Sequence, residues 1–141
     1  MKLLDTVLVA AAALDGVLRN LLLVVMRGLS NNKAEQIFGS HRPLYHLSPK
    51  IDIAYAFEVI DEDLYSDLRI IKDIRNKFAH REGPTDFRTP KVMELVRGFK
   101  SWTSGSDGYD LFVQRVKDCW SKLDAITQRE LYAQAIAPEK K

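Results

Sequence analysis

The sequence has one cysteine, Cys119, and only a small excess of positive charge, because 21 basic residues stand against 19 acidic ones. A single cysteine excludes an internal disulfide and a thiolate metal cluster, and it fits a cytosolic location. The near balance of charge argues against bulk electrostatic binding to a nucleic-acid backbone, which needs a basic excess on one face. The sequence also lacks a glycine-rich phosphate loop and a Gly-x-Ser-x-Gly elbow, so we expect no cofactor.

The apolar segment 3–29 contains no run of 18 residues without a charged residue. Asp5, Asp15, Arg19 and Arg27 interrupt it, and a charge near a bilayer centre costs roughly 2.5–3.5 kcal/mol on insertion scales. An acidic residue also stands where a signal peptide would carry basic ones. We therefore expect a core helix, buried in part by a second subunit in a homodimer. Asp15 and Arg19 have the i,i+4 spacing of an ion pair.

Apolar residues recur at helical spacing along nearly the whole chain, and no strand-like alternation competes with that pattern. With 141 residues and 46% apolar content, the chain has the size of one domain with one core. We predict a single all-α bundle of about five helices over residues 1–136, followed by a frayed tail over 137–141. Residues 81–88 are expected to form a loop and 103–108 a flexible linker.

Cap residues mark where several of these helices begin. The expected elements are a helix over about 3–28, a short helix that stops at Gly39, helices opened by Ser48-Pro49, by Asp61 and by Thr89-Pro90, and a helix over about 109–135. The side chains expected to face the core in the last four helices are Ile51, Ala54, Tyr55 and Val59, then Leu64, Leu68, Ile71, Ile74 and Phe78, then Val92, Met93, Val96 and Phe99, and finally Phe112, Val116, Cys119, Trp120, Leu123 and Ile126.

The helix that Asp61 opens ends in the segment 74–80, Ile-Arg-Asn-Lys-Phe-Ala-His. This segment carries three groups able to contact phosphate. Arg75 offers a fork of donors, Asn76 a carboxamide, and His80 an imidazole that titrates near neutral pH. On an unbroken helix Asn76 and His80 lie about 40° apart, whereas Arg75 and His80 lie about 140° apart. Arg75 therefore joins the shared face only through its long side chain, or if the helix frays at His80.

Two interpretations of this motif remain open. In the functional one, His80 is the base for a ribose hydroxyl, Arg75 stabilises charge on phosphorus, and Asn76 orients the phosphate, which gives metal-independent RNA cleavage. In the structural one, Arg75 pairs with a carboxylate such as Asp73 or Asp15, while Asn76 and His80 satisfy backbone groups at a helix end.

Other candidate groups are weaker. His41, His46 and His80 lack a fourth ligand at zinc spacing, so we expect no metal site. Cys119 lies between apolar residues at helical spacing and is expected to be a buried thiol. The basic residues Arg88, Lys91, Arg97 and Lys100 are expected to form a solvated face.

Four segments together carry a resemblance to a known family: residues 7–15, 37–39, 47–56 and 70–80. In order and spacing they resemble the mannitol operon repressor family, and the Arg-Asn-x3-His motif resembles that of the HEPN superfamily. The resemblance covers roughly residues 5 to 100. It implies an all-α HEPN-like fold and a transcriptional regulator, while the superfamily also includes metal-independent ribonucleases that assemble their site across a dimer interface.

No segment fits a helix-turn-helix reader of DNA. The best pair of helices meets at residues 58–61, and its second helix opens with Glu62-Asp63, which would repel the duplex backbone. Our leading hypothesis is a non-enzymatic regulator that acts through protein contacts rather than by direct DNA reading. The alternative is a HEPN-type ribonuclease that uses Arg75 and His80 and binds RNA.

Overall fold

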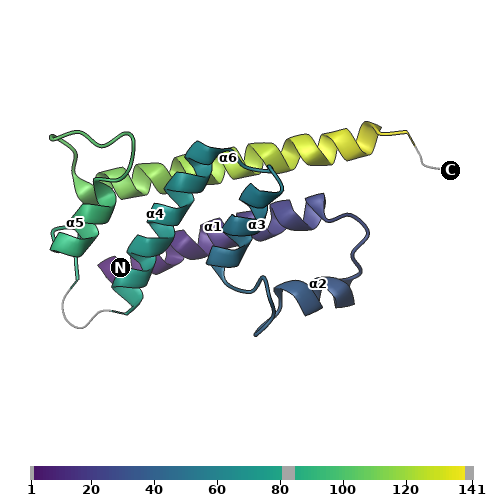
Figure 1. Cartoon of the computed structure of the whole chain (residues 1–141), viewed down its shortest axis with the longest axis horizontal. Helices are drawn as coiled ribbons and strands as arrows, with labels where there is room; N and C mark the ends of the chain where they lie inside the picture. Colours follow the sequence, from purple (N-terminus) through teal and green to yellow (C-terminus); the bar gives the residue numbers. More distant parts are fainter. Residues whose placement is uncertain (1, 81–84, 139–141) are drawn as a thin grey trace.

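The computed structural model describes residues 2–80 and 85–138, and all regular secondary structure in this part of the chain is α-helical (Figure 1). This confirms the all-α fold class. The described residues form six helices, one for each element expected from the sequence, so the predicted total of about five is one too few. They are α1 (Leu3–Val25), α2 (Asn31–Phe38), α3 (Leu47–Ala56), α4 (Glu62–Ala79), α5 (Pro90–Val96) and α6 (Gly108–Ile136).

The two longest helices, α1 and α6, pack side by side and form the long axis of the bundle (Figure 1). Helix α4 packs against both of them, and α3 and α5 pack against α4. Helix α2 lies outside this arrangement, and the C-terminal end of α6 projects beyond the other helices. The candidate motif at residues 74–80 therefore lies at the end of α4, one of the central helices.

Side-chain caps fix the starts of three helices. The Asp61 carboxylate accepts a hydrogen bond from the Leu64 amide at 2.8 Å, as the sequence predicted for α4. Asp107 caps α6 and Ser30 caps α2 in the same way, at 2.9 Å and 3.2 Å. Each bond satisfies one of the amide groups that a helix leaves free in its first turn.

One predicted cap is misplaced, and another is placed correctly but lacks the side-chain hydrogen bond of a cap. Helix α3 begins at Leu47, so Ser48 and Pro49 lie within its first turn and His46 is the cap residue. Pro49 is tolerated there because the first turn needs no amide donor. Thr89 is the N-cap residue of α5 and Pro90 is its first residue, as predicted, but the Thr89 hydroxyl accepts a hydrogen bond from the Asp86 amide and makes none to the helix.

The core contains most of the predicted side chains, including the whole set predicted for α4. Tyr55 and Trp120 are exceptions, at 39% and 42% exposed. Tyr55 instead stacks on Tyr65 with ring centroids 4.1 Å apart. Helix α6 buries residues spaced three and four apart, and Trp120 falls beside this narrow stripe because helices cover α6 on one side only. The predicted core residues Val59, Met93 and Ile126 are half-buried.

Helix α1 is long and apolar enough to cross a membrane by length and composition. It buries seven side chains inside the bundle, however, and it packs against α3, α4 and α6. These contacts favour a core helix of the domain. On its outer face Val9, Ala12, Ala13 and Gly16 are exposed.

A partly buried ion-pair cluster joins α4 to α6. The Arg115 guanidinium lies 3.4 Å from the Asp67 carboxylate of α4, and its other nitrogen contacts Asp118. Burial raises the pKa of Asp67 above its ordinary value of 3.8, and the charge of Arg115 opposes that rise. The guanidinium therefore compensates a carboxylate that the helix contact has taken out of water.

Candidate functional site

The end of α4 holds the three polar groups of the Arg-Asn-x3-His motif. Arg75 and Asn76 are half-buried, whereas His80 is exposed and is the C-terminal cap residue of the helix. The Arg75 guanidinium donates a hydrogen bond to the Asn76 side-chain oxygen at 3.2 Å. Adjacent residues on a helix point about 100° apart, so this contact requires the long arginine side chain to bend toward Asn76.

The structural interpretation expected a carboxylate partner for Arg75, and that expectation is wrong for the described residues. Asp73 pairs with Lys72 at 3.0 Å, and Asp15 pairs with Lys50. Arg75 keeps donors that can contact a phosphate or a partner, since the single bond to Asn76 uses one of five N–H groups. The His80 amide donates to the Asn76 carbonyl at 2.9 Å and thus completes the last helical turn. The loop residues Gly83 and Pro84, which follow this end, lie outside the described residues.

The remaining histidines and the cysteine supply no further chemistry. His41 and His46 are exposed, and His46 contacts the Tyr45 ring edge-on with centroids 5.1 Å apart. Among residues 2–80 and 85–138 no three His, Cys, Asp or Glu side chains gather as metal ligands would. Cys119 is buried, as predicted, and burial raises the pKa of its thiol to about 12. A thiol of this kind stays protonated and is a poor nucleophile.

The basic residues Arg88, Lys91, Arg97 and Lys100 are exposed, as predicted for a solvated face. Lys100 pairs with Asp63 of α4. This pair raises the pKa of Lys100 and lowers that of Asp63, with their mutual hydrogen bond as the largest cause in each case. The positive charge of Lys100 is thus already paired with a carboxylate of the same chain.

Lys50 is the residue that the sequence interpretation missed. Its side chain is 2% exposed, and its ammonium group donates to the Asp15 carboxylate and to the Tyr45 carbonyl, both at 2.6 Å. It therefore joins α1, the segment before α3, and α3 itself. The predicted i,i+4 pair between Asp15 and Arg19 does not form, because Arg19 lies over the Phe38 ring, 5.7 Å from its centroid.

The sequence did carry a signal for this position. Lys50 is three residues after Leu47 and four before Ala54, so it occupies the apolar face of α3 where an aliphatic residue would be expected. A lysine is almost never fully buried unless it is paired. A charged residue in phase with a core stripe therefore predicts a buried ion pair, although it does not identify the partner.

One solved structure is similar in fold. It is a chain of the X-ray structure of the MtlR–HPr complex from Escherichia coli, with a TM-score of 0.59, 16% sequence identity, and coverage of 92% of this chain and 88% of that chain. No protein-family model matches this chain, and no curated protein matches it in sequence. The similarity extends over nearly the whole chain, so this protein has a mannitol repressor-like fold.

Proposed function

We propose that this protein is a non-enzymatic regulatory domain, similar in role to the mannitol operon repressor, that works in the cytosol through contacts with a protein partner. The observation that carries the proposal is the fold shared with a chain solved in complex with the protein HPr. The balanced charge and the absence of a DNA-reading helix pair from the sequence support protein contacts over direct reading of bases. Affinity capture from cells, with proteins and RNA identified in the same eluate, should enrich a protein partner without RNA.

We expect the purified protein not to retard duplex DNA at near-physiological salt. Specific readers bind with dissociation constants on the order of 10⁻⁸–10⁻¹¹ M and contact phosphates through a basic surface. The helix that would enter the major groove of the DNA, α4, begins with two acidic residues in its first turn. A gel-shift titration with a library of genomic duplex fragments tests this, and a sequence-specific nanomolar complex would overturn the proposal.

The second candidate function is a metal-independent ribonuclease. The contact between Arg75 and Asn76 favours it, because it brings the guanidinium to the face that Asn76 shares with the exposed His80. Cleavage would use His80 as base and Arg75 as the cation at phosphorus. No second base is evident among the described residues near this helix end, so we rank this candidate below the regulator.

Arg75→Ala and His80→Ala distinguish the two candidates. If the protein is a regulator, the wild type does not cleave single-stranded RNA in the presence of a chelator. Arg75→Ala then lowers stability by about 1 kcal/mol or less, the value of one hydrogen bond to a neutral group. Chelator-resistant cleavage that both substitutions reduce by about 100-fold or more, at unchanged melting temperature, would establish the ribonuclease instead.

We further propose that the protein is a homodimer formed through the outer face of α1. This face exposes Val9 and small residues, and small side chains allow close approach of two helices. Light scattering at tens of micromolar should give the mass of two chains. Ala13→Glu, which places a charge in that face, should give the mass of one chain, and a monomeric wild type would refute the dimer.

A further inference from the structure

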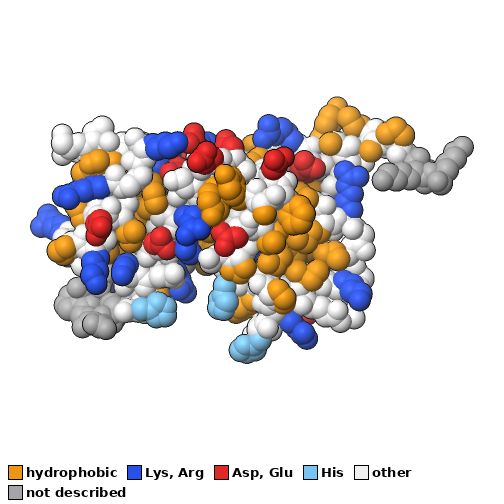
Figure 2. All heavy atoms as spheres, in the orientation of Figure 1, with side chains coloured by type: hydrophobic (Ala, Val, Ile, Leu, Met, Phe, Trp, Pro, Cys, Tyr) orange, Lys and Arg blue, Asp and Glu red, His pale blue; other side chains and the backbone are white. Residues whose placement is uncertain are grey.

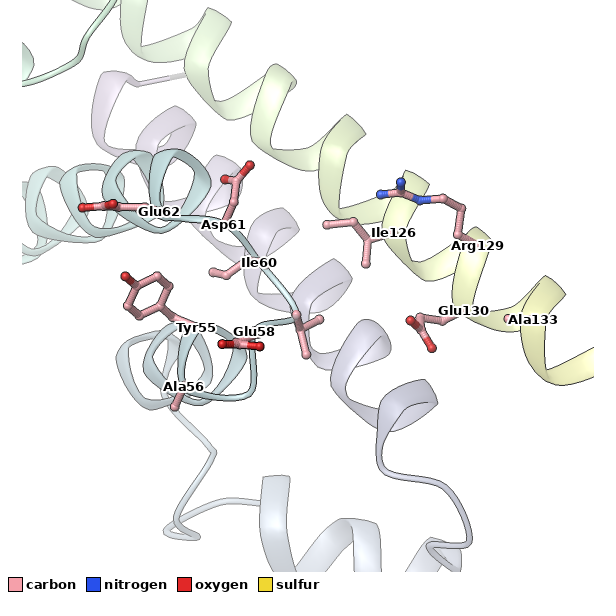
Figure 3. Close-up of a pocket in the computed structure, with 11 residues that line it drawn as sticks. Tyr55, Ala56, Glu58, Ile60, Asp61, Glu62, Ile126, Arg129, Glu130 and Ala133 are labelled. Carbon is pink, nitrogen blue, oxygen red and sulfur yellow. The ribbon is translucent and has the colours of Figure 1, made fainter. Parts of the chain in front are cut away.

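A groove of about 980 Å³ lies between the turn that joins α3 to α4 and the C-terminal half of α6 (Figure 3). Its apolar lining includes the half-buried Val59 and Ile126, and at its floor Ile60, which is 3% exposed and belongs to the core. Phe57, next to this lining, is 69% exposed, the largest exposed fraction among the large apolar side chains described. An apolar hollow with an exposed aromatic residue beside it is a surface that a partner would cover.

Acidic side chains dominate the polar part of the groove. Glu58, Asp61 and Glu62 come from the α3–α4 turn, Glu130 comes from α6, and Arg129 is the one cation lining it. Figure 3 shows Ile60 between Asp61 and Glu58 on the α3–α4 turn, and Ile126 and Glu130 on α6 across from that turn. Figure 2 shows acidic side chains gathered where α4 begins beside α6, with basic side chains next to them and others over the α5 end.

Two of these carboxylates are free to bind a partner. The carboxylates of Glu58 and Glu130 form no hydrogen bond or ion pair with any described residue. Asp61, by contrast, already caps α4 through its bond to Leu64. The groove therefore offers unpaired negative charge beside apolar surface. A cation placed between the carboxylates of its two walls would reduce their mutual repulsion.

The backbone at Glu58 adopts a conformation that favours glycine, so a glutamate at this position carries a conformational cost. Glu58 has φ of +58° and is the first residue beyond the cap of α3, where its amide donates to Tyr55 and the next amide donates to Ala54. Glycine is the residue that usually ends a helix in this way, because a side chain is strained at positive φ. A glutamate here gives up stability and places a carboxylate at the groove.

We propose that this groove binds an amphipathic helix of a protein partner, with its aliphatic side chains on Val59 and Ile126 and flanking lysine or arginine residues at Glu58 and Glu130. Helices commonly bind proteins by placing an apolar stripe in such a groove. Charge complementarity identifies the occupant, since an acidic or uncharged helix would leave the carboxylates desolvated without partners. The inference rests on the proposed function, because it assigns the surface through which the regulator contacts its partner.

The test uses a fluorescent synthetic helix of 16 residues with leucines on one face and lysines beside them, and a second helix with glutamates in place of the lysines. Fluorescence anisotropy at low salt should show saturable binding of the lysine helix to the full chain and none of the glutamate helix. Glu58→Gly should weaken binding by about fivefold, the effect of one exposed ion pair, while the melting temperature stays unchanged or rises. Glu130→Lys should weaken it by about tenfold or more, since it reverses a charge.

The matched control is Glu94→Lys, which makes the same charge reversal at an exposed position of α5 outside the groove. This variant should bind the lysine helix with the same affinity as the wild type. Equal binding of both helices, no binding, or equal losses in Glu94→Lys and Glu130→Lys would overturn the proposal. So would light scattering that shows a self-associated wild type and a dissociated Glu130→Lys, because a second copy would then occupy the groove. If the helix-binding test fails but affinity capture from cells still yields a protein partner, the groove proposal is wrong and the proposed function stands. If the capture yields RNA alone, the proposed function is contradicted.

Discussion

Asp15→Ala is expected to destabilise the protein by about 3–5 kcal/mol, although Asp15 itself is not fully buried. Its partner Lys50 is 2% exposed, while the Asp15 side chain is 38% exposed. Removing the carboxylate leaves an ammonium group in the core with only the Tyr45 carbonyl as acceptor. An uncompensated buried charge is among the most costly defects in a folded protein.

Replacing the other partner of the pair, Lys50, should lower the free energy of unfolding by less. Lys50→Met keeps most of the aliphatic volume in the core and leaves Asp15 where water can reach it, so we expect a loss of about 1–2 kcal/mol, the cost of a carbonyl without its donor. The double variant Asp15→Ala/Lys50→Met should be close to Lys50→Met alone. Equilibrium unfolding in denaturant measures all three values.

Asp52→Ala is the matched control for Asp15→Ala. Asp52 also lies in a helix and pairs with a cation, Arg69, at 3.7 Å, but both side chains are about half exposed. An exposed pair contributes about 0–1 kcal/mol, so this substitution should change the unfolding free energy little. Equal losses from Asp52→Ala and Asp15→Ala would contradict the assignment of Lys50 as a buried charge that requires a partner.

Arg115→Met is expected to destabilise the protein by about 3 kcal/mol at neutral pH and by less in acid. Burial already raises the pKa of Asp67 above 3.8, and Arg115 opposes that rise. Without the guanidinium the pKa of Asp67 rises further. A carboxyl whose pKa is higher in the folded state loses stability as pH rises from its unfolded value through its folded value.

The measurement is the difference in unfolding free energy between variant and wild type at pH 7 and at pH 4. The difference should be larger at pH 7, where Asp67 must be ionised without its partner. Adding Asp67→Asn to Arg115→Met removes the titrating group, so the double variant should recover part of the stability at pH 7 and show a smaller pH dependence. A penalty for Arg115→Met that is the same at both pH values would mean that Arg115 acts through packing alone.

The sequence alone predicted the fold class and most of the helices because both depend on local patterns. The apolar spacing of Leu64, Leu68, Ile71, Ile74 and Phe78 specifies one buried face of α4, and Asp61 specifies where that helix begins. Such patterns require no knowledge of the neighbouring helices. They failed at Tyr55 and Trp120, since the width of a buried stripe depends on how many helices cover it.

The tertiary structure alone decided which charged groups meet. Asp15 could pair with Arg19 by local spacing, yet it pairs with Lys50, 35 residues away, because packing of α3 on α1 removes Lys50 from water and a buried ammonium requires an anion. Likewise Glu58 and Glu130 lie 72 positions apart in the sequence and share a groove only because α6 runs beside the α3–α4 turn. Helix formation is read from neighbouring residues, whereas the Asp15–Lys50 pair and the groove arise from contacts between distant ones, and no local spacing encodes those contacts.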